Sequence, residues 1–438
     1  MFGTSGIRGP VGEEVTAETA LQIGRALGAE TERVVVGRDP RESGTLLVDA
    51  LAAGLRELGT DVVDLGVAAT PTVARTVGWL DADAGVSVTA SHNPPADNGL
   101  KLWQPSGQAY DAAGEERIAD RIHVDEPALR AWDGLGDRSS TDGADRHVDA
   151  LLETADGADL DLEVAVDLGN GAGRVSVEAL LEAGCRVETL NAQPDGRFPG
   201  RPSEPTAEHC TALTTLVADG PYDLGIAHDG DADRMRAVAG DGTFLSGDSL
   251  LALFAAETAE AGQRVAVPVD TSLAVEDYLA DRDVDVVRTP VGDVHVADAA
   301  SESGVAFGGE PSGAWIWPDE TLCPDGPLAA VRIATMTAEA PLEDRLSSIP
   351  TYPIRRTSVE TDRKASVMET VESSVLERYG SVETLDGVRV ETDDGWFLLR
   401  ASGTQPLVRV TAEARTESRA ASLLTDARAL VEDAIKIQ

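Results

Sequence analysis

The sequence of 438 residues has little cysteine and no long apolar run. Its three cysteines, Cys185, Cys210 and Cys323, are too few and too widely spaced for a disulfide framework or a zinc cluster. No stretch approaches the roughly 18 apolar residues that a membrane-spanning helix needs. The N-terminus, MFGTSGIRGPVGEE, lacks the apolar core of a signal peptide. These absences predict a cytoplasmic protein without a membrane segment.

Positive charge is also scarce, because 77 acidic residues face 36 lysines and arginines and the formal net charge is -41. A protein that coats nucleic acid, or docks on an anionic membrane, needs a basic face, so we expect neither partner. Only Lys101, Lys364 and Lys436 are lysines. So large a charge destabilises a compact chain at low salt, whereas about 1 M salt shortens the Debye length to about 3 Å. The composition therefore predicts a halophilic protein. A GC-rich genome is the alternative explanation of the scarce lysine, but it does not account for the excess of acidic residues. A monomer or a homodimer is expected.

The pattern of short strands and helices predicts the fold class. Three β-branched runs, each followed by a helix-like stretch, are typical of α/β units: RVVVGRD (33–39), EVAVDLG (163–169) and RVAVPVD (264–270). The C-terminal part instead shows longer strands with alternating faces and two helices. We therefore predict three α/β domains with mixed sheets and a smaller C-terminal α+β domain. The expected domains are 1–140, 141–240, 241–345 and 346–438.

The segment TASHNPPADNGLKLW (89–103) follows a strand and carries one of the three lysines. Ser91 stands at the strand end, where α/β sheets expose reactive groups. A plain turn rich in serine and asparagine is the alternative interpretation. A hydrolase dyad of Ser91 with His92 is not expected, because neighbouring side chains of an extended segment point to opposite faces.

The segment DGDADR (229–234) places three carboxylates at alternate positions after an apolar strand. Carboxylates this close repel one another unless a cation lies between them, and hard oxygen ligands suit Mg²⁺. An EF-hand is excluded, because Arg234 and Gly240 occupy the positions of the required glycine and glutamate. A solvated acidic loop remains the alternative.

Two later segments carry groups that suit a phosphorylated sugar. In GGEPSG (308–313), Glu310 and Ser312 could hydrogen-bond sugar hydroxyls, and in RASGTQPLVR (400–409) arginine forks, hydroxyls and backbone N–H groups suit a phosphate. A turn and an ordinary hairpin are the alternatives. Near the N-terminus, Arg8 of GTSGIRG (3–9) could also face a phosphate.

Taken together, the order GTSGIRG, VGRDPRESG, TASHNP with NGLK, DGDADR, GGEPSG and RASGTQP resembles the α-D-phosphohexomutase superfamily over essentially the whole chain. The resemblance implies four domains around a deep central cleft, with one loop from each domain. It implies an intramolecular phosphotransferase that interconverts sugar 6-phosphates and sugar 1-phosphates through a phosphoserine and a sugar bisphosphate.

The resemblance also implies the residue roles. Ser91 is the phosphoserine, and one of its oxygens joins Asp229, Asp231 and Asp233 in holding Mg²⁺. The groups that stabilise charge or move protons near it are Arg8, His92, Lys101 and Arg234. The sugar is held by Glu310, Ser312 and Gly292. The phosphate that is not transferred is bound by Arg400, Ser402, Gly403, Thr404 and Arg409.

Three positions depart from the usual family pattern. Ala314 replaces a histidine, Val294 stands where many relatives have lysine or arginine, and Gln405 replaces a glutamate. The form GGEPSGxW resembles the archaeal phosphoglucosamine mutase-like branch, which implies glucosamine 6-phosphate as substrate and a sugar 1,6-bisphosphate as activator. Phosphomannomutase, phosphoglucomutase or phosphopentomutase activity is the alternative. Two further alternatives are a Mg²⁺-dependent sugar phosphatase and an inactive sugar-phosphate binder.

Overall fold

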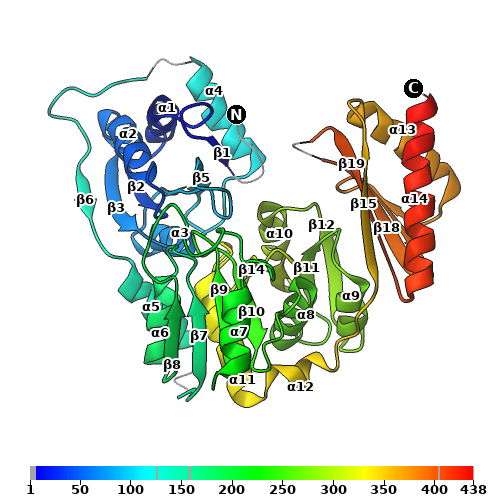
Figure 1. Ribbon diagram of the computed structural model, residues 1–438. Coiled ribbons are helices and arrows are strands. Elements are labelled where there is room, and N and C mark those ends of the chain that lie inside the picture. Colours follow the sequence, from blue (N-terminus) through cyan, green and yellow to red (C-terminus); the bar gives the residue numbers. More distant parts are fainter. Residues whose placement is uncertain (1–5, 125–126, 156–158, 403–404, 438) are drawn as a thin grey trace.

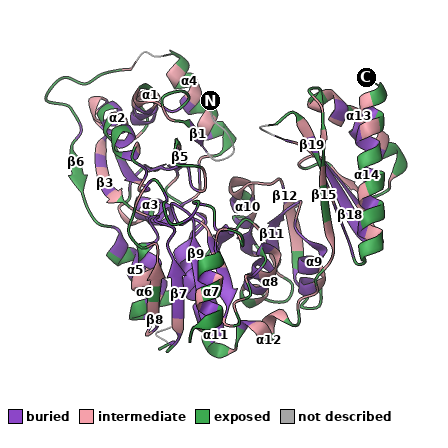
Figure 2. Cartoon of the chain, viewed as in Figure 1, coloured by how far each residue is buried: buried purple, intermediate pink, exposed green. Residues whose placement is uncertain are grey.

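The computed structural model describes residues 6–124, 127–155, 159–402 and 405–437, which form four sheets in succession along the chain (Figure 1). Buried residues gather on the sheets and on the inward faces of the helices, and exposed residues line the outer helix faces (Figure 2). Among the described residues, no helix is long and apolar enough to cross a membrane.

The first sheet has the order β1-β5-β4-β2-β3-β6. Its central strands run parallel, whereas β5 is antiparallel to both β1 and β4. Its strands are β1 (Ile7–Pro10), β2 (Arg33–Arg38), β3 (Asp61–Val67), β4 (Ala84–Val88), β5 (Asp97–Trp103) and β6 (Arg138–Ser140). The helices are α1 (Ala17–Gly28), α2 (Gly44–Glu57), α3 (Thr70–Trp79) and α4 (Ala112–Val124).

The second sheet has the order β10-β9-β7-β8. Its strands are β7 (Glu163–Asp167), β8 (Arg186–Leu190), β9 (Leu224–His228) and β10 (Met235–Ala239), and its helices are α5 (Ala144–Thr154), α6 (Arg174–Glu182) and α7 (Thr211–Asp219). All five residues of β9 are buried, because this largely apolar strand lies inside the sheet between β7, to which it is parallel, and β10, to which it is antiparallel. The acidic segment 229–234 therefore begins directly at the end of a buried strand, which fixes the position of its first residue.

The third sheet has the order β12-β11-β13-β14. Its strands are β11 (Arg264–Pro268), β12 (Asp285–Thr289), β13 (Val305–Gly309) and β14 (Trp315–Ile316). Its helices are α8 (Gly247–Thr258), α9 (Leu273–Ala280), α10 (Asp293–Ala300), α11 (Gly326–Glu339) and α12 (Leu342–Leu346). Helix α11 packs against α5 and α6, and one apolar core runs through the second and third sheets.

The C-terminal sheet is entirely antiparallel, in the order β15-β19-β18-β17-β16. Its strands are β15 (Ile354–Glu360), β16 (Val382–Glu383), β17 (Val388–Thr392), β18 (Gly395–Ala401) and β19 (Leu407–Ala414). Helices α13 (Lys364–Arg378) and α14 (Glu417–Ile437) share one apolar core with this sheet. The prediction of three α/β domains and an α+β domain is confirmed, while the exact domain boundaries remain predictions.

One segment that the sequence suggested was a loop is partly strand. Residues 97–103 form β5, which pairs with β1 and β4, so Lys101 lies on a strand. Strand pairing overrode the polar local sequence of this segment, because the backbone groups gain partners from a neighbouring strand. Arg400 and Arg409 lie on β18 and β19, in the part of the chain where longer strands were predicted, and they are direct cross-strand partners.

Candidate active site

Ser91 lies just beyond the end of β4 in an unusual backbone conformation. Its φ is 49°, in the left-handed region that residues with a side chain rarely adopt. The hydroxyl Oγ donates to Asp229 Oδ2 at 2.6 Å and lies 3.3 Å from Nδ1 of His92. The expectation that Ser91 and His92 point to opposite faces was wrong, because it assumed extended backbone. Ser91 is nevertheless 1% exposed and directed at the acidic segment.

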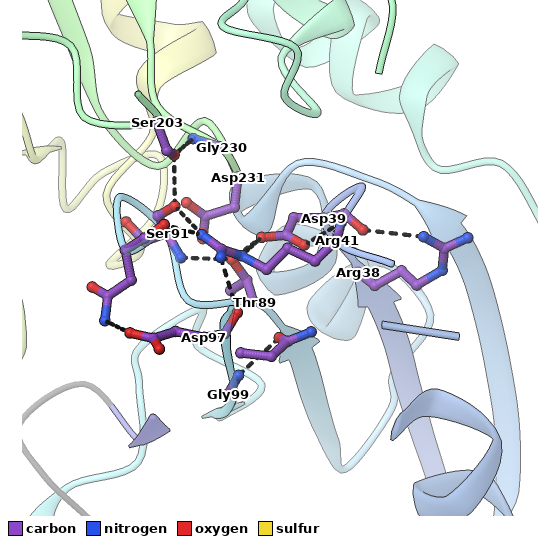
Figure 3. A network of polar contacts seen from close by, with 12 residues as sticks. Arg38, Asp39, Arg41, Thr89, Ser91, Asp97, Gly99, Ser203, Gly230 and Asp231 are labelled. Atoms are coloured by element: carbon purple, nitrogen blue, oxygen red, sulfur yellow. Dashed lines mark hydrogen bonds and ion pairs between the residues drawn. The ribbon is translucent and has the colours of Figure 1, made fainter. Parts of the chain in front are cut away.

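Arg41 holds the backbone of the segment that follows β4. Its guanidinium donates to the carbonyl oxygens of Ser91, Asn93, Pro94 and Asp97 at 2.5 to 2.9 Å. Figure 3 shows this network from close by. The same side chain forms a fully buried ion pair with Asp39 at 2.9 Å. A guanidinium has five N–H donors in a rigid fork, so one arginine can fix a whole turn.

Ser203 connects the segments that carry Ser91 and Asp229. Its hydroxyl donates to the Ser91 carbonyl oxygen at 2.8 Å and accepts from the N–H of Gly230 at 2.9 Å (Figure 3). A Cβ on Gly230 would come within 2.8 Å of the Ser203 hydroxyl, so only glycine permits this approach. The first and second domains therefore meet at the Ser91 backbone.

The three aspartates of DGDADR form one buried cluster. Asp229, Asp231 and Asp233 are 0%, 1% and 5% exposed, and each offers a carboxylate oxygen within 4.8 Å of the others. Thr70, the first residue of α3, donates through its hydroxyl to Asp231 Oδ2 at 2.7 Å. Among the described residues, Asp231 Oδ1 and Asp233 Oδ1 are buried and have no hydrogen-bond partner.

This cluster fits a hard divalent cation. Burial and repulsion from Asp231 and Asp233 raise the pKa of Asp229 well above its usual range, and burial with repulsion from Asp231 raises the pKa of Asp233 to about 7. Buried, unpartnered carboxylate oxygens are costly unless they are paired or coordinate a metal. Three oxygen donors converging on one point are ligands that Mg²⁺ prefers. The residues present therefore fit a magnesium ion.

Cationic side chains surround the cluster. Lys101 is 2% exposed and forms an ion pair with Asp293, the first residue of α10. Burial alone would lower the pKa of Lys101, but Asp293 and Asp233 outweigh it and raise this pKa. Burial and the neighbouring Arg234 and Arg8 lower the pKa of His92 to about 3, so His92 is neutral at pH 7.

The GGEPSG segment brings together the predicted sugar-binding residues. Glu310 is 7% exposed and its carboxylate accepts from Ser312 Oγ at 3.1 Å and from the N–H of Gly292 at 2.7 Å. Burial and repulsion from Asp293 raise the pKa of Glu310. Ala314, where the family usually has histidine, is buried and forms a β-bridge with Arg234. The backbone pairing of Ala314 with Arg234 thus holds the GGEPSG segment next to the acidic cluster.

Two of the predicted phosphate-binding residues, Arg400 and Arg409, lie on strands of the C-terminal sheet. Arg400 and Arg409 are opposite each other on β18 and β19, and Arg400 pairs with Asp386 at 3.0 Å. Lys364, at the start of α13, donates to the carbonyl oxygens of Ser402 and Gln405. Two arginines directly opposite each other repel, so an anion between them would be favourable.

Two predicted phosphate ligands, Gly403 and Thr404, lie outside the described residues.

Several residues that support the site were missed from the sequence. Arg41 lies in VGRDPRESG, a segment that carried the resemblance but received no role. Thr70, followed by proline, was recognisable only as a helix start, which gives no sign of a contact with Asp231. Asp293, Ser203 and Lys364 reach their partners across 192, 112 and 38 residues of sequence, so local patterns could not reveal them.

Comparison with known proteins defines the class. The family models of the phosphoglucomutase/phosphomannomutase domains match in sequence order. Alpha/beta/alpha domains I, II and III match residues 1–128, 145–242 and 246–352, and the C-terminal domain matches residues 357–430. The chain belongs to the phosphoglucomutase/phosphomannomutase family. It is an enzyme, and the resemblance to the phosphohexomutases is confirmed.

Individual relatives match over nearly their whole length. A protein of Methanothermobacter thermautotrophicus named "Probable phosphoglucosamine mutase" is 45% identical over 447 residues, covering 99% of this chain and 98% of the relative. A protein of the same name from Pyrococcus abyssi is 41% identical and covers the same shares. The crystal structure of a phosphoglucomutase/phosphomannomutase family protein from Burkholderia thailandensis has a TM-score of 0.87 at 28% identity, covering 99% of this chain and 98% of that one.

Proposed function

We propose that this enzyme interconverts glucosamine 6-phosphate and glucosamine 1-phosphate, with Ser91 as the phosphoryl carrier. The names of the archaeal relatives, which are 41% to 45% identical over nearly the full chain, support the substrate. The single observation that carries the chemistry is the 2.6 Å hydrogen bond from Ser91 Oγ to Asp229, inside the buried carboxylate cluster.

In the proposed cycle, phospho-Ser91 transfers its phosphoryl group to O1 of glucosamine 6-phosphate and gives the 1,6-bisphosphate. The bisphosphate turns over, its 6-phosphoryl group returns to Ser91, and the 1-phosphate leaves. Each transfer breaks one P–O bond and forms another, so no phosphate is lost. A phosphoserine carries about -1.5 to -2 charges, which adds to the charge of the three aspartates.

The charge balance assigns the remaining roles. Mg²⁺ held by Asp229, Asp231 and Asp233 would neutralise this charge and polarise the transferring phosphoryl group. Lys101, Arg8 and Arg234 supply fixed positive charge around Ser91. In the first transfer, the attacking sugar hydroxyl loses a proton and the leaving serine oxygen gains one. In the second, the attacking Ser91 hydroxyl loses a proton and the leaving O6 of the sugar gains one; we assign both exchanges to Lys101 and its neighbours.

The substrate has two ends, and the far end needs its own site. We assign the non-reacting phosphate to Arg400, Arg409 and the backbone near Ser402, together with Gly403 and Thr404. Glu310, Ser312 and the Gly292 backbone would contact the sugar hydroxyls between the two ends. A sugar 1,6-bisphosphate would activate the enzyme by phosphorylating Ser91 when it has lost its phosphoryl group.

The test is an assay by phosphorus NMR, with Mg²⁺ and a trace of glucosamine 1,6-bisphosphate. Because the net charge is -41, the assay is run in about 2–3 M KCl, which screens self-repulsion. Glucosamine 6-phosphate, glucose 1-phosphate and mannose 1-phosphate are compared in parallel. Fastest interconversion of the glucosamine phosphates supports the proposal, and preference for another sugar overturns the substrate. Release of inorganic phosphate alone overturns the mutase in favour of a phosphatase.

A further inference from the structure

The buried ion pair between Lys101 and Asp293 joins two domains inside the proposed reaction site. Lys101 comes from β5 of the first domain, and Asp293 begins α10 of the third. The side chains are 3% and 13% exposed, so solvent screens the pair weakly. A contact of this kind fixes the direction of the ammonium group, which a four-carbon lysine side chain alone does not.

A second carboxylate competes for the same ammonium. Asp233 of the acidic cluster is one of the charges that raise the pKa of Lys101, but Lys101 pairs with Asp293 instead. Asp233 Oδ1 has no partner among the described residues. Without Asp293, Asp233 would exert the strongest remaining attraction on the Lys101 ammonium, and a lysine bound there would oppose a metal ion at that oxygen.

The turn that carries Asp293 is held firmly from several sides. Gly292 has a φ of 133°, which favours glycine, and its N–H donates to Glu310. The next residue, Val294, packs against the apolar cluster of the first domain that contains Trp103. The Lys101 ammonium lies 4.7 Å from the centre of the Trp103 ring. Because residue 294 is apolar, it offers no cation that would compete with Lys101 for Asp293.

We propose that Asp293 is a positioning residue, which holds the Lys101 ammonium toward the reacting groups and away from Asp233. The inference rests on the proposed function only for the kinetic role of Lys101. The competition between Asp293 and Asp233 stands on the unphosphorylated protein. It can therefore be tested without any sugar substrate.

The principal variant is Asp293→Asn, which removes the charge with little change in shape. Asp298→Asn is the matched control, because Asp298 lies on the same helix and also contacts the first domain, accepting from Gln108 at 3.0 Å. Asp293→Glu keeps the charge and tests rescue. If Asp293→Asn does not fold, Asp293→Ser, which also lacks the charge, takes its place in the measurements below.

The substrate-free readouts are NMR and metal binding. With only three lysines in the chain, a protein labelled with ¹⁵N-lysine has at most three side-chain signals, and Lys101→Met identifies the one from Lys101. We expect the Lys101 ammonium signal in wild type, Asp298→Asn and Asp293→Glu, and its loss or displacement in Asp293→Asn. The same variant should bind Mg²⁺ about tenfold more weakly, because the released Lys101 ammonium would compete with the metal ion for Asp233. Unchanged signal and unchanged Mg²⁺ affinity overturn the proposal.

The kinetic measurements distinguish a role of Asp293 in positioning Lys101 from a role in stabilising the fold. With saturating Mg²⁺, Asp293→Asn should lower kcat about 100-fold and change KM less than about threefold, because misplacing a reacting group by about 1 Å costs that much. Asp298→Asn should leave both values unchanged. In a Lys101→Met background, Asp293→Asn should cause no further loss of kcat, because it acts through the missing lysine. Additive losses would overturn the proposal, whereas an inactive wild type would overturn only the proposed function.

Discussion

The two ends of the proposed substrate site are built in different ways. The residues around Ser91 are buried and tied together across domains, through Arg41, Ser203 and Asp229. The C-terminal arginines are more open: Arg409 is exposed, and the Arg400 side chain is 29% exposed beside Asp386. The first region is held in place by hydrogen bonds to protein, and the second presents charge to solvent.

This difference follows from what each end must do. Phosphoryl transfer depends on positioning and on charges that are in place before the reaction, so its groups must be fixed. The far phosphate is only bound, and in a mutase it must be released and bound again when the bisphosphate turns over. Changes at the fixed end should therefore lower kcat, and changes at the open end should mainly raise KM.

The largest effect is expected from Ser91→Ala. Loss of the phosphoryl carrier should lower kcat at least about 10⁴-fold, because no covalent intermediate can form. The measurement is the phosphorus NMR assay, with the circular dichroism melting curve as the test of folding. Ser106→Ala on an exposed turn is the control and should keep wild-type activity. Wild-type turnover by Ser91→Ala would contradict the assignment of Ser91 as the phosphoryl carrier at the buried end of the site.

Removal of one cluster carboxylate should have the next largest effect. A catalytic metal contributes several kcal/mol to transition-state stabilisation, so Asp231→Asn should lower kcat about 1000-fold. Mg²⁺ should raise the melting temperature of the wild type through ligand linkage, and much less that of the variant. Equal stabilisation of both proteins by Mg²⁺ would show that the cluster is not the magnesium site.

At the open end, Arg400→Ala should raise KM about 10- to 100-fold and lower kcat less than threefold. The size follows from hydrogen bonds to charged groups, which contribute about 1.5–3 kcal/mol. Arg428→Ala is the matched control, because Arg428 is exposed on α14 and forms its ion pair with Glu432 one helical turn away. A loss confined to kcat would mean that the two ends do not differ in the way described.

The smallest effect is expected in the pH dependence of the metal-free protein. The folded pKa of Asp233 is about 7, above its ordinary value of 3.8, so the folded state binds this proton more tightly than the unfolded state. Its contribution to stability is complete below pH 3.8 and is lost as the pH rises through about 7. Denaturation in EDTA should show this slope, and Asp233→Asn should flatten it. A steeper dependence of stability on pH in Asp233→Asn would contradict the conclusion that burial and repulsion from Asp231 raise the pKa of Asp233.

The fold class and the carboxylate cluster could be predicted from the sequence, whereas the contacts between distant segments could not. The strand before DGDADR and the periodic apolar residues of β18 and β19 carry local signals, so the fold class and the carboxylate cluster could be predicted. The left-handed conformation of Ser91 could not, because carbonyl contacts from Arg41 and Ser203 stabilise it. The partners of Lys101 and Asp231 come from distant segments, and a pattern of neighbouring residues contains no information about them.

The most direct test is to locate the phosphoryl group on the enzyme and follow it. The protein is treated with glucosamine 1,6-bisphosphate labelled with ³²P, digested and mapped by mass spectrometry, and a second portion is chased with glucosamine 6-phosphate. We predict a single labelled peptide with phosphate on Ser91, and a chase that moves the label into the sugar phosphates. Label on another residue, or label released only as inorganic phosphate, would contradict the account.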